Sequence, residues 1–119
     1  MSLEDIEQKL GEILAAKAGA WKTASIIKGG TISDAIDLGG NFAYLQVVVP
    51  TIDSAQLELQ VGETLGGPFQ DFGQNALTVA GTGAFSDTWV LGGWRFIKIK
   101  ASAAQSTADR AFRVRGVTY

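Results

Sequence analysis

A chain of 119 residues without cysteine or histidine is long enough to bury one hydrophobic core without disulfides or metal. The two absences remove the commonest catalytic base, the thiol nucleophile and the main transition-metal ligands, so we expect no enzyme, no cofactor and no metal site. A net charge of −2 and the lack of any apolar run of roughly 18 residues argue against nucleic-acid and membrane partners.

Residues 1–19 predict an amphipathic helical arm. Ser2 is a good N-cap, and Gly19 is a plausible C-terminal stop. The apolar stripe follows alternating steps of three and four residues and consists of Leu3, Ile6, Leu10 and Ile13. Two heptads are too few to secure a coiled coil, so the arm either packs on its own domain or bundles with other copies. We expect the stripe to drive homo-oligomerisation.

Residues 20–119 predict a single β domain. Glycine doublets divide the chain into short β-branched and aromatic runs, because paired glycines turn the backbone without steric cost; they are Gly29-Gly30, Gly39-Gly40, Gly66-Gly67 and Gly92-Gly93. The expected strands are 21–27, 31–38, 42–49, 55–62, 69–72, 76–80, 85–91, 94–101 and 110–119. Short strands with frequent turns predict a mainly β fold, a jelly-roll-like antiparallel β-sandwich with a short N-terminal α-helix.

Charge is distributed unevenly along the chain. Residues 31–94 carry seven acidic and no basic side chains, whereas residues 95–119 carry six basic side chains and one acidic one. The basic strands either pair with acidic strands inside one sheet or face an acidic partner or a sister copy. We expect the two basic segments to be neighbours and to bind a partner through Arg95, Lys98, Lys100, Arg113 and Arg115.

The aromatic residues allow two interpretations. Trp21, Trp89 and Trp94, with Tyr44 and Tyr119, would form a sugar-stacking platform if they were exposed together in a groove. Tryptophans in a small β-sandwich otherwise belong to the core or to an interface. Exposure of a tryptophan cluster would favour glycan binding, and burial would count against it.

Four stretches carry a resemblance to a known group of proteins. They are 33–40 (SDAIDLGG), 57–72 (LELQVGETLGGPFQDF), 92–102 (GGWRFIKIKAS) and 105–110 (QSTADR). Together they are similar to small β-sandwich proteins encoded among the structural genes of tailed bacteriophages. The resemblance covers residues 31–117, and its motifs are turn and strand signatures rather than catalytic ones.

The resemblance implies a phage virion component, most simply a head decoration (cement) protein that binds and stabilises the capsid lattice. The partners would then be the major capsid protein and other copies of this chain, with a trimer suited to local three-fold positions. The expected location is the capsid surface, after assembly in the host cytoplasm. The alternative is a glycan-binding or adaptor module of a phage tail fibre or baseplate.

Overall fold

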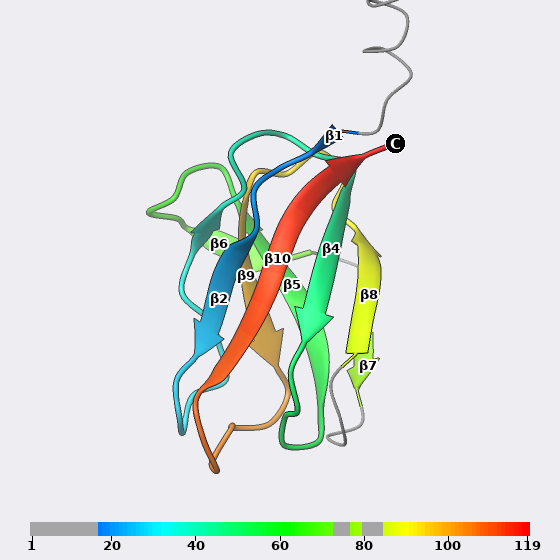
Figure 1. Cartoon of the computed structure of the whole chain (residues 1–119). Helices are drawn as coiled ribbons and strands as arrows, with labels where there is room; N and C mark the ends of the chain where they lie inside the picture. The colour runs from blue at the N-terminus through cyan, green and yellow to red at the C-terminus, as the bar shows by residue number, and fades with distance from the viewer. Residues whose placement is uncertain (1–16, 73–76, 80–84) are drawn as a thin grey trace, which may run out of the picture.

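The structure is a computed structural model that describes residues 17–72, 77–79 and 85–119, and these residues form ten β-strands in two antiparallel sheets (Figure 1). The mainly β fold predicted from the sequence is confirmed. The predicted helix, with Leu3, Ile6, Leu10 and Ile13, lies outside the described residues.

Sheet A has β10 and β4 at its centre. Both β1 and β2 pair with one edge of β10, β4 pairs with the other edge, and β8 pairs with β4. The strands of sheet A are β1 (Lys17–Ala18), β2 (Lys22–Ile26), β4 (Tyr44–Val49), β8 (Phe85–Val90) and β10 (Arg110–Thr118).

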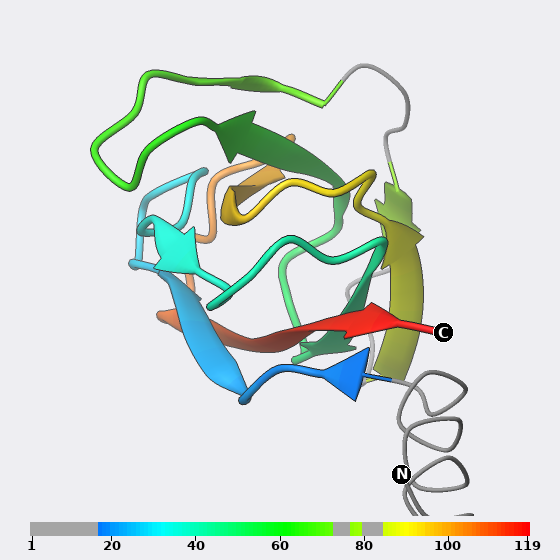
Figure 2. The ribbon, with the colours of Figure 1, turned by 90° about the horizontal axis from the view of Figure 1, so that it is seen from above.

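Sheet B has β9 and β5 at its centre. The short β3 pairs with β9, and β6 and β7 pair with successive parts of β5. Its strands are β3 (Ile36–Asp37), β5 (Ala55–Gly62), β6 (Phe69–Asp71), β7 (Leu77–Val79) and β9 (Phe96–Ala101). Seen along the strands, β2, β10 and β4 form one layer and β9 and β5 form the other (Figure 2).

One hydrophobic core fills the space between the sheets. Strand β4 turns Leu45, Val47 and Val49 inward, and β9 does the same with Ile97 and Ile99. The strands predicted over 55–62 and 94–101 are therefore confirmed as β5 and β9, and buried residues alternate with more exposed ones along most of both. Each large apolar side chain buried in this way contributes about 1.5–3 kcal/mol to the free energy of unfolding.

The glycine doublets are corners of the fold, as predicted. Each doublet contains at least one residue with positive φ, and the turn between β8 and β9 uses two, Gly92 at 66° and Gly93 at 89°. A side chain with a Cβ atom rarely adopts this conformation. This turn places Trp94 two residues before the start of β9.

The segment predicted as a strand over 31–38 is divided by a corner between the sheets. Ser33 forms hydrogen bonds with the backbone of Ile99 in β9. The next residue, Asp34, bonds to Ser25 in β2: its backbone N–H donates to Ser25 O at 3.3 Å, and its carboxylate accepts from Ser25 N at 2.8 Å. Only Ile36–Asp37 forms a strand there. The alternation of apolar residues could not distinguish a continuous strand from a chain that changes sheets.

The prediction that the helix continues to Gly19 is wrong for its last residues. Lys17 pairs with Thr118 and Ala18 with Val117, so both belong to sheet A. Gly19 N extends this pairing by donating to Gly116 O at 2.8 Å. The open edge of β10 thus outweighs the helical preference of this segment.

The connection between β9 and β10 crosses from sheet B to sheet A and is held by the fully buried Gln105. The Gln105 Oε1 atom accepts from Asp53 N at 2.7 Å, and Nε2 donates to Asp53 O at 3.2 Å and Ala103 O at 3.1 Å. The Asp53 carboxylate accepts in turn from Ser106, Thr107 and Arg110. The connection between β9 and β10 is therefore held by hydrogen bonds that centre on Gln105 and Asp53.

Candidate functional site

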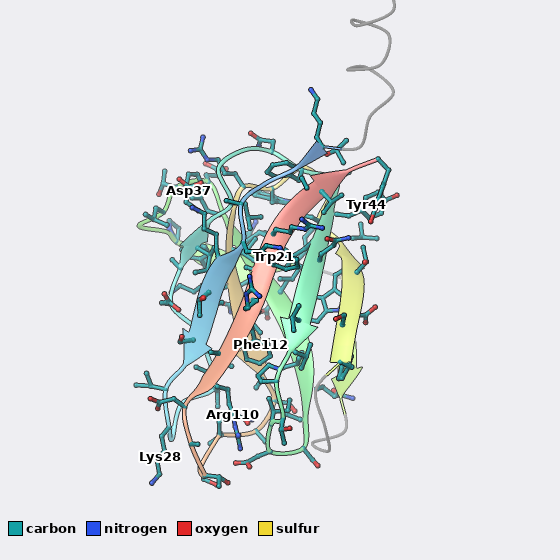
Figure 3. All side chains as sticks on the ribbon, viewed as in Figure 1. Trp21, Lys28, Asp37, Tyr44, Arg110 and Phe112 are labelled. Carbon is teal, nitrogen blue, oxygen red and sulfur yellow. The ribbon has the colours of Figure 1, made fainter. Side chains whose placement is uncertain are left out.

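The outer face of sheet A carries two arginines stacked against one tryptophan. Arg113 and Arg115 are two residues apart on β10 and therefore point to the same face. Their Cζ atoms lie 5.1 Å and 4.5 Å from the centroid of the Trp21 ring, which comes from the connection between β1 and β2. Trp21 is 37% exposed and lies over β10 (Figure 3). Each exposed cation–π contact of this kind contributes about 0.5–1 kcal/mol.

Hydrogen bonds extend this arrangement across β4. Arg115 Nε donates to Gln46 Oε1 at 2.6 Å, and Gln46 Nε2 donates to the Tyr119 hydroxyl at 3.2 Å. The Tyr119 ring lies against Tyr44, with centroids 5.6 Å apart. We call this surface the arginine–aromatic face; it consists of Trp21, Tyr44, Gln46, Arg113, Arg115 and Tyr119.

A shallow hollow of about 300 Å³ adjoins the face, between Trp21 and β8. Its lining residues are Trp21, Gln46, Val47, Val48, Ser86, Asp87 and Thr88. The hollow is open, and Asp87 is the acidic residue in this lining.

The charge of the face is not neutralised within the part of the chain that the structure describes. The ion pairs found there join Arg95 to Asp37, Lys100 to Asp71 and Arg110 to Asp53, and none involves Arg113 or Arg115. Two guanidinium groups that share one aromatic ring repel each other. An acidic group from another molecule would relieve that repulsion.

The prediction that the two basic segments are neighbours is wrong, because β9 lies in sheet B and β10 in sheet A. Lys100 stands opposite Glu58 and lies 3.5 Å from Asp71, so its charge is balanced inside sheet B. Lys98 Nζ lies 4.7 Å from the Phe69 ring centroid. The five basic residues thus divide between two faces of the molecule, and the structure brings together only Arg113 and Arg115.

Arg95 is fixed beside β3 by a two-point ion pair. Its Nε and Nη2 atoms donate to the two carboxylate oxygens of Asp37 at 2.7 Å and 3.1 Å. The hydrogen bond from Arg95, with a second one from Gly39 N, lowers the pKa of Asp37 from 3.8 to about 2.

We expect Asp37→Asn to reduce the pH dependence of stability in acid. The folded-state pKa of Asp37 lies below its ordinary value, so the pair stabilises the fold above pH 3.8 and loses its contribution as the pH falls toward about 2. Melting temperatures measured across that window should fall less steeply for the variant. Glu63→Gln, which removes an exposed carboxylate that bonds to no described residue, is the control, and equal slopes for all three proteins would contradict the expectation.

The three tryptophans do not form one platform. Trp89 is 3% exposed in the core, and its Nε1 donates to Asp87. Trp21 lies on sheet A, whereas Trp94 precedes β9 of sheet B and is half-buried. The exposed tryptophan cluster that would favour a sugar-stacking platform is therefore absent among these three residues, and each surface tryptophan has its own surroundings.

Within the described ranges, no group of three or more carboxylates is arranged to hold a metal ion. The same residues contain no helix long and apolar enough to cross a membrane.

No protein-family model and no curated protein matches the sequence. Several solved structures are similar in shape, including the following three. The SPBc2 prophage-derived protein YomS is 14% identical, with 87% of this chain and 95% of that chain covered and a TM-score of 0.55. A chain of the cyanophage Pam1 capsid asymmetric unit is 13% identical, with 86% of this chain and 82% of that chain covered and a TM-score of 0.46. The Yersinia pseudotuberculosis-derived mitogen is 16% identical, with 86% of this chain and 87% of that chain covered and a TM-score of 0.43. The similarity to YomS shows a fold shared over nearly the whole of both chains.

Proposed function

We propose that this chain is a non-enzymatic structural protein of a phage virion that docks through its arginine–aromatic face onto an acidic surface of the major capsid protein. In this role it decorates the capsid surface and stabilises the head lattice, after assembly in the host cytoplasm. The observation that carries the docking proposal is the stacking of Arg113 and Arg115 on Trp21 without a carboxylate partner among the described residues.

The virion part of the proposal is supported by the fold shared with the prophage-derived YomS. The strand order supports a jelly-roll architecture: β2, β4, β8 and β10 share one sheet, β3, β5 and β9 share the other, and the chain alternates between them. Such a scaffold presents flat sheet faces, and a lattice-binding protein needs flat faces rather than a reactive cleft.

The composition of the face suits protein docking. Tryptophan and arginine are the side chains that most often dominate the binding energy of protein interfaces. Here both are fixed before binding, because Trp21 holds the two guanidinium groups and Gln46 holds Arg115. Preorganisation lowers the entropic cost of association.

Self-association remains part of the proposal. The stripe of Leu3, Ile6, Leu10 and Ile13 would join copies, most simply into trimers. Several weak docking faces in one assembly would bind a repeated lattice far more tightly than one face alone.

We expect the double variant Arg113→Glu, Arg115→Glu to bind particles at least about 10-fold more weakly, because it places carboxylates against an acidic partner. Binding is measured by co-sedimentation with particles of the encoding phage that have been stripped of this protein. Wild-type binding should also weaken as salt is added, since the Debye length is about 8 Å at physiological ionic strength.

The matched control is Lys28→Glu with Lys98→Glu, which changes the net charge equally at sites away from the face. Equal losses from both variants, or binding that does not respond to salt, would overturn the docking face. Electron microscopy of labelled protein on whole particles distinguishes a location on the phage head from the alternative location, an adaptor in the tail fibre or baseplate.

A further inference from the structure

Two adjoining hollows flank Trp94 on sheet B, away from the arginine–aromatic face. The larger, of about 370 Å³, is lined by Asn41, Gly62, Glu63, Trp94, Arg95 and Phe96. The smaller, of about 210 Å³, shares Gly62, Glu63 and Trp94 with it and adds Thr64 and Gln70. The larger hollow alone falls within the roughly 300–1,000 Å³ typical of small-molecule sites. We call the two hollows together the Trp94 site.

The aromatic wall of the site is held in place. Trp94 packs against the hydrophobic core and also lines both hollows, so part of the indole is anchored and part is presented to a ligand. Its backbone is set by the Gly92–Gly93 turn, where Asn41 Nδ2 donates to Gly93 O at 2.7 Å. Binding of a ligand to this ring therefore carries little entropic cost for ordering the Trp94 side chain.

Several polar groups at the site have unused hydrogen-bonding capacity. Asn41 uses its amide nitrogen on Gly93, which leaves its Oδ1 atom as an acceptor. Arg95 uses Nε and Nη2 on Asp37, which leaves Nη1 as a donor. Glu63 and Gln70 are exposed, and neither side chain bonds to a described residue. Donors and acceptors therefore line the same two hollows as the Trp94 ring.

Charge at the site selects against anions. The positive charge of Arg95 is balanced by Asp37 at 2.7 Å, whereas the negative charge of Glu63 has no cationic partner among the described residues. Phosphate and carboxylate ligands would meet uncompensated repulsion. A neutral ligand that has both an apolar face and a ring of hydroxyl groups satisfies the indole and the polar groups together.

We propose that the Trp94 site binds a neutral saccharide, with one sugar ring stacked on Trp94 and its hydroxyl groups bonded to Glu63 and Asn41. This site is separate from the arginine–aromatic face, so it does not depend on the docking proposal. It would add recognition of a glycan-bearing surface to a protein whose opposite sheet contacts a protein partner.

The probes are three neutral disaccharides, cellobiose, lactose and N,N′-diacetylchitobiose, with 3′-sialyllactose as the acidic counterpart of lactose. At least one neutral probe should shift the Trp94 indole N–H resonance and saturate with a Kd of about 1 mM. The indole signal of Trp21 should not move, and 3′-sialyllactose should bind no more tightly than lactose. The proposal is overturned if no neutral probe shifts Trp94 at tens of millimolar.

Variants assign the effect to the site. Trp94→Ala should abolish binding, and Trp21→Ala, a tryptophan on the other face, should leave it unchanged. Because Trp94 contacts the core, Glu63→Ala provides a second variant at an exposed position, with an expected loss of at least about threefold. Full binding by Glu63→Ala, or equal losses in both tryptophan variants, would contradict the assignment. Particle docking should be unaffected by Glu63→Ala.

Discussion

Replacing Gln105 by leucine should lower the free energy of unfolding by about 2–5 kcal/mol, because each buried polar group that loses its partner costs about 1–3 kcal/mol. The variant keeps the approximate volume of the side chain but removes its three hydrogen bonds to the backbone of Asp53 and Ala103. Gln105 is fully buried, so water cannot replace these bonds. Urea denaturation followed by tryptophan fluorescence gives the free energy.

The control is Gln56→Leu, at an exposed glutamine on β5 whose side chain bonds to no described residue. Its stability should change by no more than about 0.5 kcal/mol. A loss below about 1 kcal/mol for Gln105→Leu would contradict the expectation. It would show that the backbone groups of Asp53 and Ala103 find other partners when the Gln105 amide is removed.

Gly116→Ala should lower the free energy of unfolding by about 3 kcal/mol, which is at the upper end of the effects measured when a packed core receives an extra carbon atom. Gly116 lies near the C-terminal end of β10, and an added Cβ would overlap the Cγ and Cδ2 atoms of Phe42 and lie 2.8 Å from its Cβ. The overlap includes the base of the phenylalanine side chain, so a rotamer change cannot remove it. The free energy of unfolding is measured by guanidinium denaturation.

A double-mutant cycle identifies the cause. In a Phe42→Ala background, which removes the Cγ and Cδ2 overlaps and leaves only the contact with Cβ, the same glycine substitution should cost less, which gives a coupling energy of about 1–3 kcal/mol. Gly66→Ala is the control, since a Cβ atom there meets nothing within 4 Å and the residue has no positive φ. Equal costs in the two backgrounds would show that Phe42 is not the obstacle.

Local pattern predicted most of the strands. The expected strand 55–62 has the bounds of β5, and the expected strands 42–49 and 94–101 include β4 and β9. These features depend on neighbouring residues, whose side chains alternate between the two faces of a strand. The position of Phe112 in the core follows from the same periodicity.

Spatial neighbours could not be predicted in this way. The sequence predicts that the two basic segments are neighbours. The connection that contains Gln105 instead carries the chain from β9 in sheet B to β10 in sheet A. A polar run such as QSTADR is typical of a solvated loop, and nothing local marks its first residue as buried. The Trp94 site depends in the same way on Asn41, Glu63 and Trp94, which are brought together from three separate turns.

The position of β10 between β2 and β4 governs when the protein can fold during synthesis. Strands β2 and β4 have no strand between them until residues 110–118 have left the ribosome, although both emerge much earlier. Until then the inward faces of both strands, with Ile26, Leu45 and Val47, have no completed core to cover them. Non-local pairing of this kind folds slowly and exposes apolar strands to other chains. A nascent chain of this protein therefore passes through an aggregation-prone stage that ends only when β10 is inserted between β2 and β4.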